Sequence, residues 1–395
     1  MPGQEKPYRV YRGGRQKGKV PLKTRPARAP VRGKTADGAG DYRGPGPVKQ
    51  RKRWSWGRRI GVLLALLLLV VIVWAVASYF SVRSGVNAAN KRLPAGTKRT
   101  LTKQDSLILN SPTDILLLGT DHSKWPGHEG QRSDSIMLIR TDPSLHRVVY
   151  LTIPRDLRVP IPGVGDTKVN AAMQAGGPAL AIRTIRDYTG LPINHVITVD
   201  FAQFEDVIDA VGGVDVNVPE EILSKFECPL KTQAECDAWK GWHFVKGPQH
   251  MKGKRALIYS RARKNALNPG DSDFTRAEHQ QDVLQALLRK MTSVSTLAKL
   301  PFIGDTLTKP LATDLSPFQL LQIGWLYKRG SVMRCRLGGT PQTLPDGQAV
   351  IVAEGDDKER VLLTVEGKTA PLPPRPGEHT YGAGCVKGRN AHFPR

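Results

Sequence analysis

The sequence predicts an α/β domain with a central sheet, preceded by one N-terminal transmembrane helix. Two features indicate this. A charge-free apolar stretch lies near residue 70, and beyond it short apolar runs bounded by Gly, Pro and Asp alternate with segments of helical periodicity. Strands interleaved with helices are typical of α/β domains. The chain has 395 residues, which is enough for one large or two ordinary domains.

Residues 1–59 form a strongly basic tail. They hold 18 Lys and Arg against 3 Asp and Glu, and the whole chain has a net charge of +24. The tail is rich in Gly and Pro and poor in large apolar residues, so we expect it to be disordered. A basic arm can bind nucleic acid or anionic lipid. Its position beside a membrane span favours membrane lipid and argues against nucleic acid.

The stretch Ile60–Phe80 has 21 residues without charge or proline. As a helix it is about 30 Å long, enough to cross a bilayer core. Basic residues crowd its N-terminal side, and only Arg83 follows it closely. This asymmetry places the tail in the cytoplasm and all later residues outside the cell, anchored to the cell membrane by a single span. A cleaved signal peptide is the alternative, which the length of the run disfavours.

The chain after the span divides by pattern. Residues 81–112 mix polar residues and Pro with little periodicity and predict an extracellular stalk. The domain predicted over 113–330 has strands at 115–118, 135–139, 148–153, 195–199 and 214–218, and helices at 178–188, 201–211, 274–291 and 317–326. Residues 331–367 carry two more strand-like runs, 348–353 and 361–365, which we expect to complete or flank this domain. A flexible tail is predicted over 368–395.

Two aspartates mark a candidate metal site. Asp121 ends one apolar run and Asp134 precedes the next, so a loop joins two predicted strands and both residues lie at the same edge of the sheet. Mg²⁺ takes oxygen ligands and usually binds one or two carboxylates together with substrate phosphates. The alternative is that both residues only form turns, as Asp commonly does.

Arginines at the ends of predicted elements suggest an anion site. Arg155 follows a strand, and Arg261 and Arg263 are two residues apart. If that segment is extended, the two guanidinium groups face the same side. Arginine matches phosphate oxygens bidentately, so these residues favour a phosphate or pyrophosphate pocket. Scattered surface arginine is the alternative.

A second part of this anion site is predicted at the start of a long helix. Arg276, His279 and Gln280 stand at i, i+3 and i+4 and therefore share one helix face. The first turn of a helix attracts anions through its free N–H groups and its dipole. We therefore expect this face to contact the same phosphate groups.

The cysteines and several missing motifs bear on the cellular compartment, on zinc binding and on the class of enzyme. All four cysteines follow the span, where an oxidising compartment permits disulfides. Proximity favours Cys228–Cys236 and Cys335–Cys385 among three possible pairings, and free buried thiols are the alternative. The sequence has no C-x-x-C spacing, which argues against a zinc site. The sequence has no P-loop, G-x-S-x-G or H-E-x-x-H motif, which argues against P-loop nucleotide hydrolysis and serine hydrolysis.

Seven segments occur in the order of the motifs of one family, the LytR-CpsA-Psr family. They are LLLGTD, RSDSIMLIR, LTIPRDLRV, KVNAAMQAGG, HVITVDFAQFEDVIDAVGGVDVNVP, YSRAR and DSDFTRAEHQQ, within residues 113–330. The resemblance implies a three-layer α/β/α fold with a central mixed sheet that buries a polyprenyl chain. It implies Mg²⁺-dependent transfer of a glycopolymer from a polyprenyl-pyrophosphate carrier to a peptidoglycan hydroxyl. The new bond would be a phosphodiester, and polyprenyl phosphate would be released.

The resemblance also implies roles for single residues. Asp121 and Asp134 are similar to the metal-associated acids of the family, and Arg132 belongs to the same motif as Asp134. Six further residues are similar to the pyrophosphate-binding motif residues of the family: Arg155, Arg261, Arg263, Asp273, Arg276 and Gln280. We expect Asp121, Asp134 and Arg155 to take part in catalysis, and Asp121 could accept the proton of the attacking hydroxyl.

His279 departs from the family pattern, because most members have a second arginine there. Histidine has an unperturbed pKa of about 6.5, so its charge is adjustable near neutrality. If His279 faces the pyrophosphate, carrier affinity should fall as pH rises through the neutral range. The alternative is that His279 turns away from the anion and only packs against the stalk or a neighbouring loop.

Two other functions stay open. The same site would hydrolyse a lipid pyrophosphate if water were the nucleophile. The chain could also be a non-catalytic membrane regulator or lipid-binding module, although a short tail without a helix-turn-helix pattern argues against direct DNA control. Phosphoryl transfer needs positioning and charge neutralisation, which arginines and Mg²⁺ supply, so we favour the transferase.

Overall fold

The computed structural model describes residues 8–10, 19–21, 56–104, 106–121, 132–225, 228–262, 265–268, 273–353, 355–373 and 382–388. The chain forms two units, Met1–Gly61 and Val62–Arg395. In the first unit, β1 (Tyr8–Val10) pairs antiparallel with β2 (Lys19–Pro21), so these two segments are ordered where the sequence predicts disorder. The remainder of the predicted disordered tail up to residue 55 lies outside the described residues.

The long helix α1 (Trp56–Arg92) contains the whole predicted span. It includes an 18-residue window with a mean hydropathy of 3.2, and no other helix in the described part of the chain is long and apolar enough to cross a membrane. The helix continues past Phe80 to Arg92, and Ala89 in this continuation is wholly buried. The predicted stalk therefore begins as part of α1 and packs against the domain.

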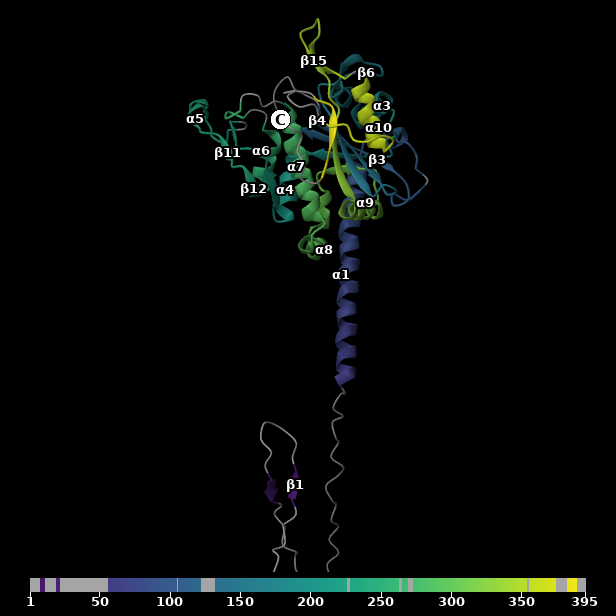
Figure 1. Cartoon of the computed structure of the whole chain (residues 1–395), viewed down its shortest axis with the longest axis vertical. Coiled ribbons are helices and arrows are strands. Elements are labelled where there is room, and N and C mark those ends of the chain that lie inside the picture. The colour runs from purple at the N-terminus through teal and green to yellow at the C-terminus, as the bar shows by residue number, and fades with distance from the viewer. Residues whose placement is uncertain are drawn as a thin grey trace, which may run out of the picture. The chain divides into compact units, whose positions relative to one another are not determined.

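A seven-stranded mixed sheet lies at the centre of the second unit (Figure 1). β3 pairs in parallel with β8 and β5 in parallel with β14, while β4 is antiparallel to both β3 and β5. The spatial order is β13 (Leu311–Thr313), β8 (His195–Asp200), β3 (Thr113–Asp121), β4 (Arg132–Asp142), β5 (Arg147–Ile153), β14 (Ser331–Arg336) and β17 (Gly384–Lys387).

Helices cover both faces of this sheet, because successive strand residues point to opposite sides and both sides are apolar. On one face, Leu116 and Leu138 pack against α3 (Ala171–Thr189) and α10 (Asp356–Glu366). On the other face, Met137 and Tyr150 pack against α7 (Asp273–Met291) and α9 (Pro317–Arg329). This confirms the predicted three-layer α/β/α fold.

The remaining elements surround these layers. Helices α4 (Phe201–Ala210), α6 (Gly253–Arg261) and α8 (Val294–Thr308) share a second apolar core with α7. The short elements are α2 (Thr97–Thr100), α5 (Gln233–Ala238), β6 (Arg158–Ile161), β7 (Gly165–Lys168), β9 (Val214–Val218), β10 (Ile222–Ser224), β11 (Trp242–Phe244), β12 (Gly247–Met251), β15 (Thr340–Thr343) and β16 (Ala349–Val352).

The helix predicted over 178–188 is the second part of α3. Gly176 and Gly177 have non-helical dihedral angles, with φ of 61° at Gly177, and they kink the helix just before Pro178. A proline is tolerated at the start of a helical segment, where its missing N–H would have no helical partner. Gly190 ends the helix as predicted, with φ of 72° and its N–H donated to the carbonyl of Arg186 at 2.8 Å.

The C-terminal part of the chain differs from the prediction in three places. Residues 361–365, predicted as a strand, lie in α10, which has three acidic residues in its first turn and ends at Gly367 with φ of 85°. The short run VLLTV fits both periodicities, and these helix ends decide between them. The strand β14 was not predicted. The predicted flexible tail contains β17, although residues 374–381 and 389–395 lie outside the described residues.

Both predicted disulfides are present, Cys228–Cys236 and Cys335–Cys385. Cys335 on β14 stands directly opposite Cys385 on β17 in the antiparallel register. This bridge spans a sequence separation of 50 residues. Closing a loop of that size is worth about 4 kcal/mol in the chain-entropy model. It explains how a Pro- and Gly-rich segment adds a strand to the sheet edge.

Candidate active site at one edge of the sheet

Strand ends that carry charged residues meet at one edge of the central sheet. β3, β5, β8 and β14 run in the same direction, and β4 begins where β3 ends. Asp121 ends β3, Arg132 begins β4 and Asp200 ends β8. Asp121 is paired with Arg132 in the ladder, and Thr120 with Asp200. The edge therefore brings two acidic positions and a basic position together.

Asp134 lies at a β-bulge in this edge. The pairing passes from Gly119 opposite Ser135 to Thr120 opposite Ser133, so Asp134 is the extra residue of β4. Bulges redirect side chains and are frequent next to active sites. The backbone thus confirms the predicted location of Asp134 at the same edge as Asp121. The predicted roles of these two carboxylates stay predictions.

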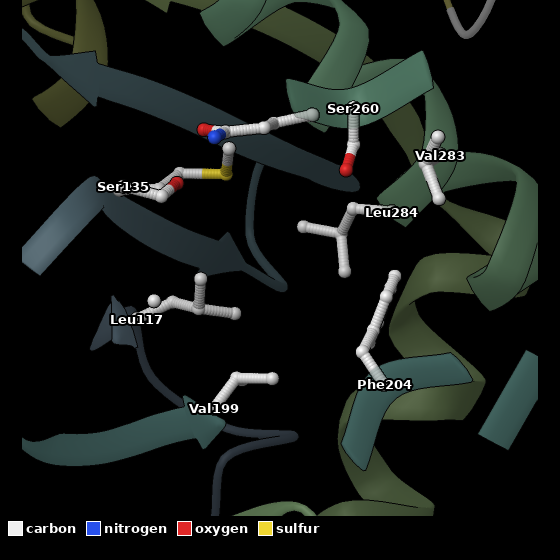
Figure 2. A pocket seen from close by; sticks show the side chains of 10 residues that line it. Leu117, Ser135, Val199, Phe204, Ser260, Val283 and Leu284 are labelled. Carbon is white, nitrogen blue, oxygen red and sulfur yellow. The ribbon is translucent and has the colours of Figure 1, made fainter. Parts of the chain in front are cut away.

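A pocket lies between the sheet and the helices α4, α6 and α7, with an empty volume of about 430 Å³ that includes space open to solvent. Ser135 and Ser260 lie on one side of it and Val199 and Phe204 on the opposite side (Figure 2). Gln280 from α7 also lines the pocket. The remaining lining residues are Leu117, Gly119, Met137, Val283 and Leu284.

The polar part of the lining lies nearer to the charged edge. Gly119 and Ser135 form one pair of the β3–β4 ladder, and Leu117 and Met137 form the pair two residues farther from Asp121. Alternate strand residues face the same side, so both pairs face the pocket. A molecule with an anionic head and an apolar tail matches this gradient, with its head at the sheet edge and its tail among the apolar side chains.

The first turns of α7 hold four of the predicted anion-binding residues, Asp273, Arg276, His279 and Gln280, and the structure separates the last three. Arg276 is 5% exposed and His279 is 0% exposed, whereas Gln280 is half-buried and lines the pocket. Asp273 is the first residue of the helix, one residue before its predicted start. Of these residues, Gln280 has a position from which it reaches a pocket ligand directly.

His279 packs against Tyr259 of α6, with ring centroids 4.4 Å apart and planes inclined by 37°. Burial raises the pKa of Tyr259 well above its usual value, and Asp282 adds to the effect, so the phenol stays neutral. His279 is absent from the lining of the described pocket. The packing alternative expected the stalk or a loop as the partner of His279, whereas the partner in the structure is a helix. The predicted contact of His279 with the anion stays a prediction.

The segment Tyr259-Ser260-Arg261 is helical, contrary to the extended conformation on which the same-face argument depends. These residues form the last turn of α6, and Ala262 caps it by donating its N–H to the carbonyl of Tyr259 at 3.3 Å. The 2.0-residue period of a strand therefore does not apply there, and Arg263 lies outside the described residues. Arg261 ends α6 directly after Ser260, which lines the pocket.

Arg155 lies in the turn that follows β5, at the charged edge. Its Nε is 3.4 Å from Asp156 Oδ2, and its side chain is 21% exposed. Lys168 holds the other oxygen of Asp156 at 2.9 Å. The backbone carbonyl of Arg155 accepts the N–H of Asn170 at 3.2 Å. These contacts fix the turn while the arginine side chain remains partly accessible.

Sequence reasoning missed a buried polar network behind α7. Arg334 on β14 is wholly buried, and it donates from Nη1 to Asp282 Oδ1 at 3.0 Å and from Nε to Gln281. Arg336 is 3.5 Å from Glu278 Oε1; burial lowers the pKa of Arg336, and Glu278 opposes that shift. The two arginines of SVMRCR are a visible signal in the sequence. They also interrupt the apolar run by which a strand is recognised, so this strand was not predicted.

The donor set at this edge fits a hard cation. In the part of the chain that the structure describes, no three His, Cys, Asp or Glu side chains gather into a metal-binding group. A site with only Asp121 and Asp134 would leave most positions to phosphate oxygens and water, which is how Mg²⁺ is usually bound. Ser133, between Arg132 and Asp134, is 1% exposed, and its buried hydroxyl has no hydrogen-bond partner among the described residues.

Comparisons with known proteins agree with the fold and with the sequence motifs. The model of the LytR_cpsA_psr family matches residues 76–362. The chain is 32% identical over 273 residues to the polyisoprenyl-teichoic acid–peptidoglycan teichoic acid transferase TagV of Bacillus subtilis (strain 168), covering 68% of this chain and 67% of TagV. It is also 32% identical over 273 residues to TagU of Bacillus mycoides (strain KBAB4), a transferase of the same description, covering 67% and 82%.

Solved structures show the same architecture. The crystal structure of B. subtilis TagV is similar with a TM-score of 0.54 and 30% identity, covering 65% of this chain and 97% of that chain. The structure of TagT bound to LI-WTA is similar with a TM-score of 0.53 and 25% identity, covering 67% and 93%.

Proposed function

We propose that this chain, which belongs to the LytR_cpsA_psr family, transfers a glycopolymer from a polyprenyl-pyrophosphate carrier to peptidoglycan. The observation that carries the proposal is the pocket, apolar on the side of Phe204 and polar toward the sheet edge of Asp121. An isoprenoid chain fits the apolar side, and its pyrophosphate then lies at the edge where Arg155 and Arg132 are placed. The transferase names of the two relatives support the same reaction.

The reaction moves one phosphoryl group together with its glycopolymer. A hydroxyl oxygen of peptidoglycan attacks the phosphorus that bears the sugar, and the bond from this phosphorus to the bridging oxygen breaks. The bridging oxygen leaves with the polyprenyl phosphate, and the hydroxyl proton passes to a base. The product is a phosphodiester between glycopolymer and peptidoglycan. Such a reaction requires positioning and charge neutralisation more than covalent participation of the protein.

Residues of this chain supply both requirements. Arg155 and Arg261 neutralise charge on the pyrophosphate and on the leaving phosphate, since guanidinium groups hold phosphate oxygens in a fixed geometry. Gln280 orients the carrier head from α7. Asp121 and Asp134 are the residues that would hold Mg²⁺, which supplies further charge neutralisation at the pyrophosphate when bound. Asp121 accepts the proton of the attacking hydroxyl where it is not engaged with the ion.

The topology of the chain agrees with an external substrate. With the basic tail on the cytoplasmic side, α1 carries the domain to the outer face of the membrane, where peptidoglycan lies. The carrier is anchored in the same membrane. The two disulfides fit an oxidising extracellular location.

An assay with the full chain tests this function. The purified protein is incubated with Mg²⁺ and a polyprenyl-pyrophosphate-linked glycopolymer, with and without peptidoglycan. We expect peptidoglycan-linked polymer and polyprenyl phosphate to appear together, and only when the acceptor is present. Release of polyprenyl phosphate at the same rate without acceptor would identify a hydrolase, and no release under either condition would favour a non-catalytic lipid-binding role.

A further inference from the structure

The helix α8 (Val294–Thr308) lies along the part of α1 that leaves the membrane. The indole Nε1 of Trp74 on α1 donates to the carbonyl of Ala298 at 3.1 Å. Farther along, Arg92 donates to the carbonyl of Thr308 at 2.9 Å. Because both sequences ascend between these contacts, α8 runs in the same direction as α1 and beside it.

Two glycines fix this helix pair at close distance. A Cβ on Gly304 of α8 would be 2.7 Å from the Oγ of Ser81 and 3.0 Å from the backbone N of Val82. A Cβ on Gly85 of α1 would be 2.9 Å from the Cα of Asp305. Contacts this short leave no room for a side chain, so the two helices meet through their backbones. The level of α8 along α1 is therefore set by packing.

This level puts the beginning of α8 beside the apolar stretch rather than beyond it. Trp74 is six residues before Phe80, where the charge-free stretch ends. At the rise of an α-helix this is about 9 Å inside the end of the stretch. Ala298 contacts Trp74, so the N-terminal half of α8 lies at the level of the last turns of the span. Figure 1 shows α8 at the end of the domain from which α1 leaves.

Large apolar side chains are exposed on α8 from its first residue to just past its middle. Val294 is 80% exposed, Phe302 is 83% exposed and Leu297 is 37% exposed. Single exposed apolar residues are ordinary on a protein surface. Three on one short helix, beside a membrane-crossing helix, are typical of a segment that lies in the membrane interface. Lys299 is also exposed here, and a lysine can keep its ammonium group among the headgroups while its stem lies in the apolar region.

The opposite side of α8 faces the apolar core beside the pocket. Leu300, Ile303 and Leu307 pack into the apolar core that contains Phe204 and Val283, two residues of the pocket lining. Helix α8 is thus apolar on both sides, with one side exposed beside the span and the other forming support for the pocket wall. An isoprenoid chain that moves along α8 from the membrane to the pocket would stay in contact with apolar side chains.

We infer that residues 294–302 of α8 insert into the leaflet on the domain side of the membrane, next to α1, and guide the carrier's isoprenoid chain into the pocket. The occupant of the exposed surface is lipid, because the contacts with α1 place this surface at the depth of the span. The inference that α8 inserts depends only on α1 crossing the membrane. The guiding role rests on the proposed function.

Accessibility of a nitroxide label tests the insertion in the full chain reconstituted in vesicles of phosphatidylglycerol and phosphatidylcholine. All four native cysteines are in disulfides, so an introduced cysteine is the one reactive thiol. The variants are Phe302→Cys and Val294→Cys. The matched control is Val164→Cys, which replaces a residue that is 50% exposed in the β6–β7 turn, at the other end of the domain from α8 (Figure 1).

We expect labels at 302 and 294 to be accessible to oxygen and protected from a water-soluble nickel chelate, and the label at 164 to show the reverse. Equal access of the chelate to all three labels would overturn the insertion. Protection accompanied by magnetic coupling between labels on different molecules would also overturn it, because a second copy of the chain would then cover the surface.

The guiding role has its own test. Phe302→Asp should lower transfer from a long-chain carrier embedded in vesicles by about tenfold or more, since insertion loses the burial of a large apolar side chain. Transfer from a short-chain carrier dispersed in detergent should not change, and Val164→Asp should change neither rate. Equal losses with both carriers would overturn the guiding role. If the unsubstituted protein transferred neither carrier, the proposed function would fail while the label measurements still decided the insertion.

Discussion

Arg334 of β14, which is wholly buried, donates to Asp282 of α7 at 3.0 Å. The same arginine donates to Gln281, and Gln281 donates to Thr152 of β5. Tyr259 of α6 donates to the other oxygen of Asp282 at 3.3 Å. These bonds join the sheet to two helices that line the pocket. They fix the position of α7 relative to the sheet. They therefore also fix the positions of Gln280 in the pocket and of the buried Arg276 and His279.

We therefore predict that Arg334→Met destabilises the protein by about 3–5 kcal/mol, because it leaves a buried carboxylate without its cation. The measurement is thermal unfolding of the detergent-solubilised chain, followed by circular dichroism. The double variant Arg334→Met/Asp282→Leu should recover most of the loss, since no buried charge is then left alone. A double variant as unstable as the single one would show that packing, not charge, sets the cost.

The stability of the protein should depend on pH through Asp114. Burial raises the pKa of this carboxyl to about 7, although Arg140 beside it favours the charged form. Between about pH 4 and pH 7 the folded state then holds a proton that the unfolded state releases. Stability should therefore decrease as pH rises through this window, by at most about 4 kcal/mol.

The variant Asp114→Asn isolates this effect. It should flatten the slope of stability against pH between pH 4 and 7, because an amide does not titrate. The unfolding temperature of both proteins across that range supplies the comparison. If both slopes are the same, another group titrates in this window and Asp114 is ionised throughout.

Filling the apolar side of the pocket should shorten the carrier that the protein accepts. We predict that Leu117→Trp weakens binding of long polyprenyl phosphates by tenfold or more but leaves short ones nearly unaffected, because the added ring occupies space needed by the tail. A series of polyprenyl phosphates of increasing length supplies the measurement. Val245→Trp, at a residue that is 54% exposed, is the matched control. Uniform weakening at every length would instead indicate a general packing defect.

The carboxylates at the sheet edge should be necessary for turnover but not for folding. We predict that Asp121→Asn and Asp134→Asn each lower the transfer rate by about a hundredfold or more. The Mg²⁺ concentration required for half-maximal rate should rise in whichever variant retains activity. Asp166→Asn, at a carboxylate in β7 that is 56% exposed, is the control. Full activity of either edge variant would remove that residue from the catalytic set.

Arginines near the pocket should contribute to affinity for the carrier head. Arg155→Ala and Arg261→Ala should each weaken binding of a polyprenyl pyrophosphate by about 1.5–3 kcal/mol, the value of a charge-assisted hydrogen bond. Arg255→Ala is the control, because Arg255 lies over the Phe244 ring at 4.6 Å and donates to the carbonyl of His243. Equal affinity of the Arg261 variant and the unsubstituted protein would show that the end of α6 does not reach the head group.

The sequence predicted those parts of the fold in which one local pattern acts alone. Examples are the apolar runs of β3, β4 and β5 and the helical periodicity of α7. These elements are buried, and burial is what produces a clear apolar pattern in the sequence. The prediction from sequence failed where tertiary contacts determine the local structure. β14 contains Arg334 and Arg336, whose charges are satisfied by α7, and no local rule reveals that partner. β17 is added to the sheet by Cys385, and the run 361–365 becomes helical through its ends.

The candidate site was predictable to a similar extent. The position of Asp121 follows from strand direction, because consecutive strand ends share an edge. The bulge at Asp134 and the helical ending at Arg261 depend on backbone detail that a motif does not carry. His279 illustrates the same limit: its spacing from Arg276 predicts a shared face, but the packing of Tyr259 decides how deeply that face is buried.

The most direct test of the proposed reaction is to follow the two phosphates of the carrier separately. Two carriers are prepared, one with radioactive phosphate next to the sugar and one with radioactive phosphate next to the polyprenyl chain. With peptidoglycan present, we expect the sugar-side label to move onto peptidoglycan and the lipid-side label to stay in polyprenyl phosphate. Sugar-side label found on free polymer, with none on peptidoglycan, would contradict transfer and identify hydrolysis.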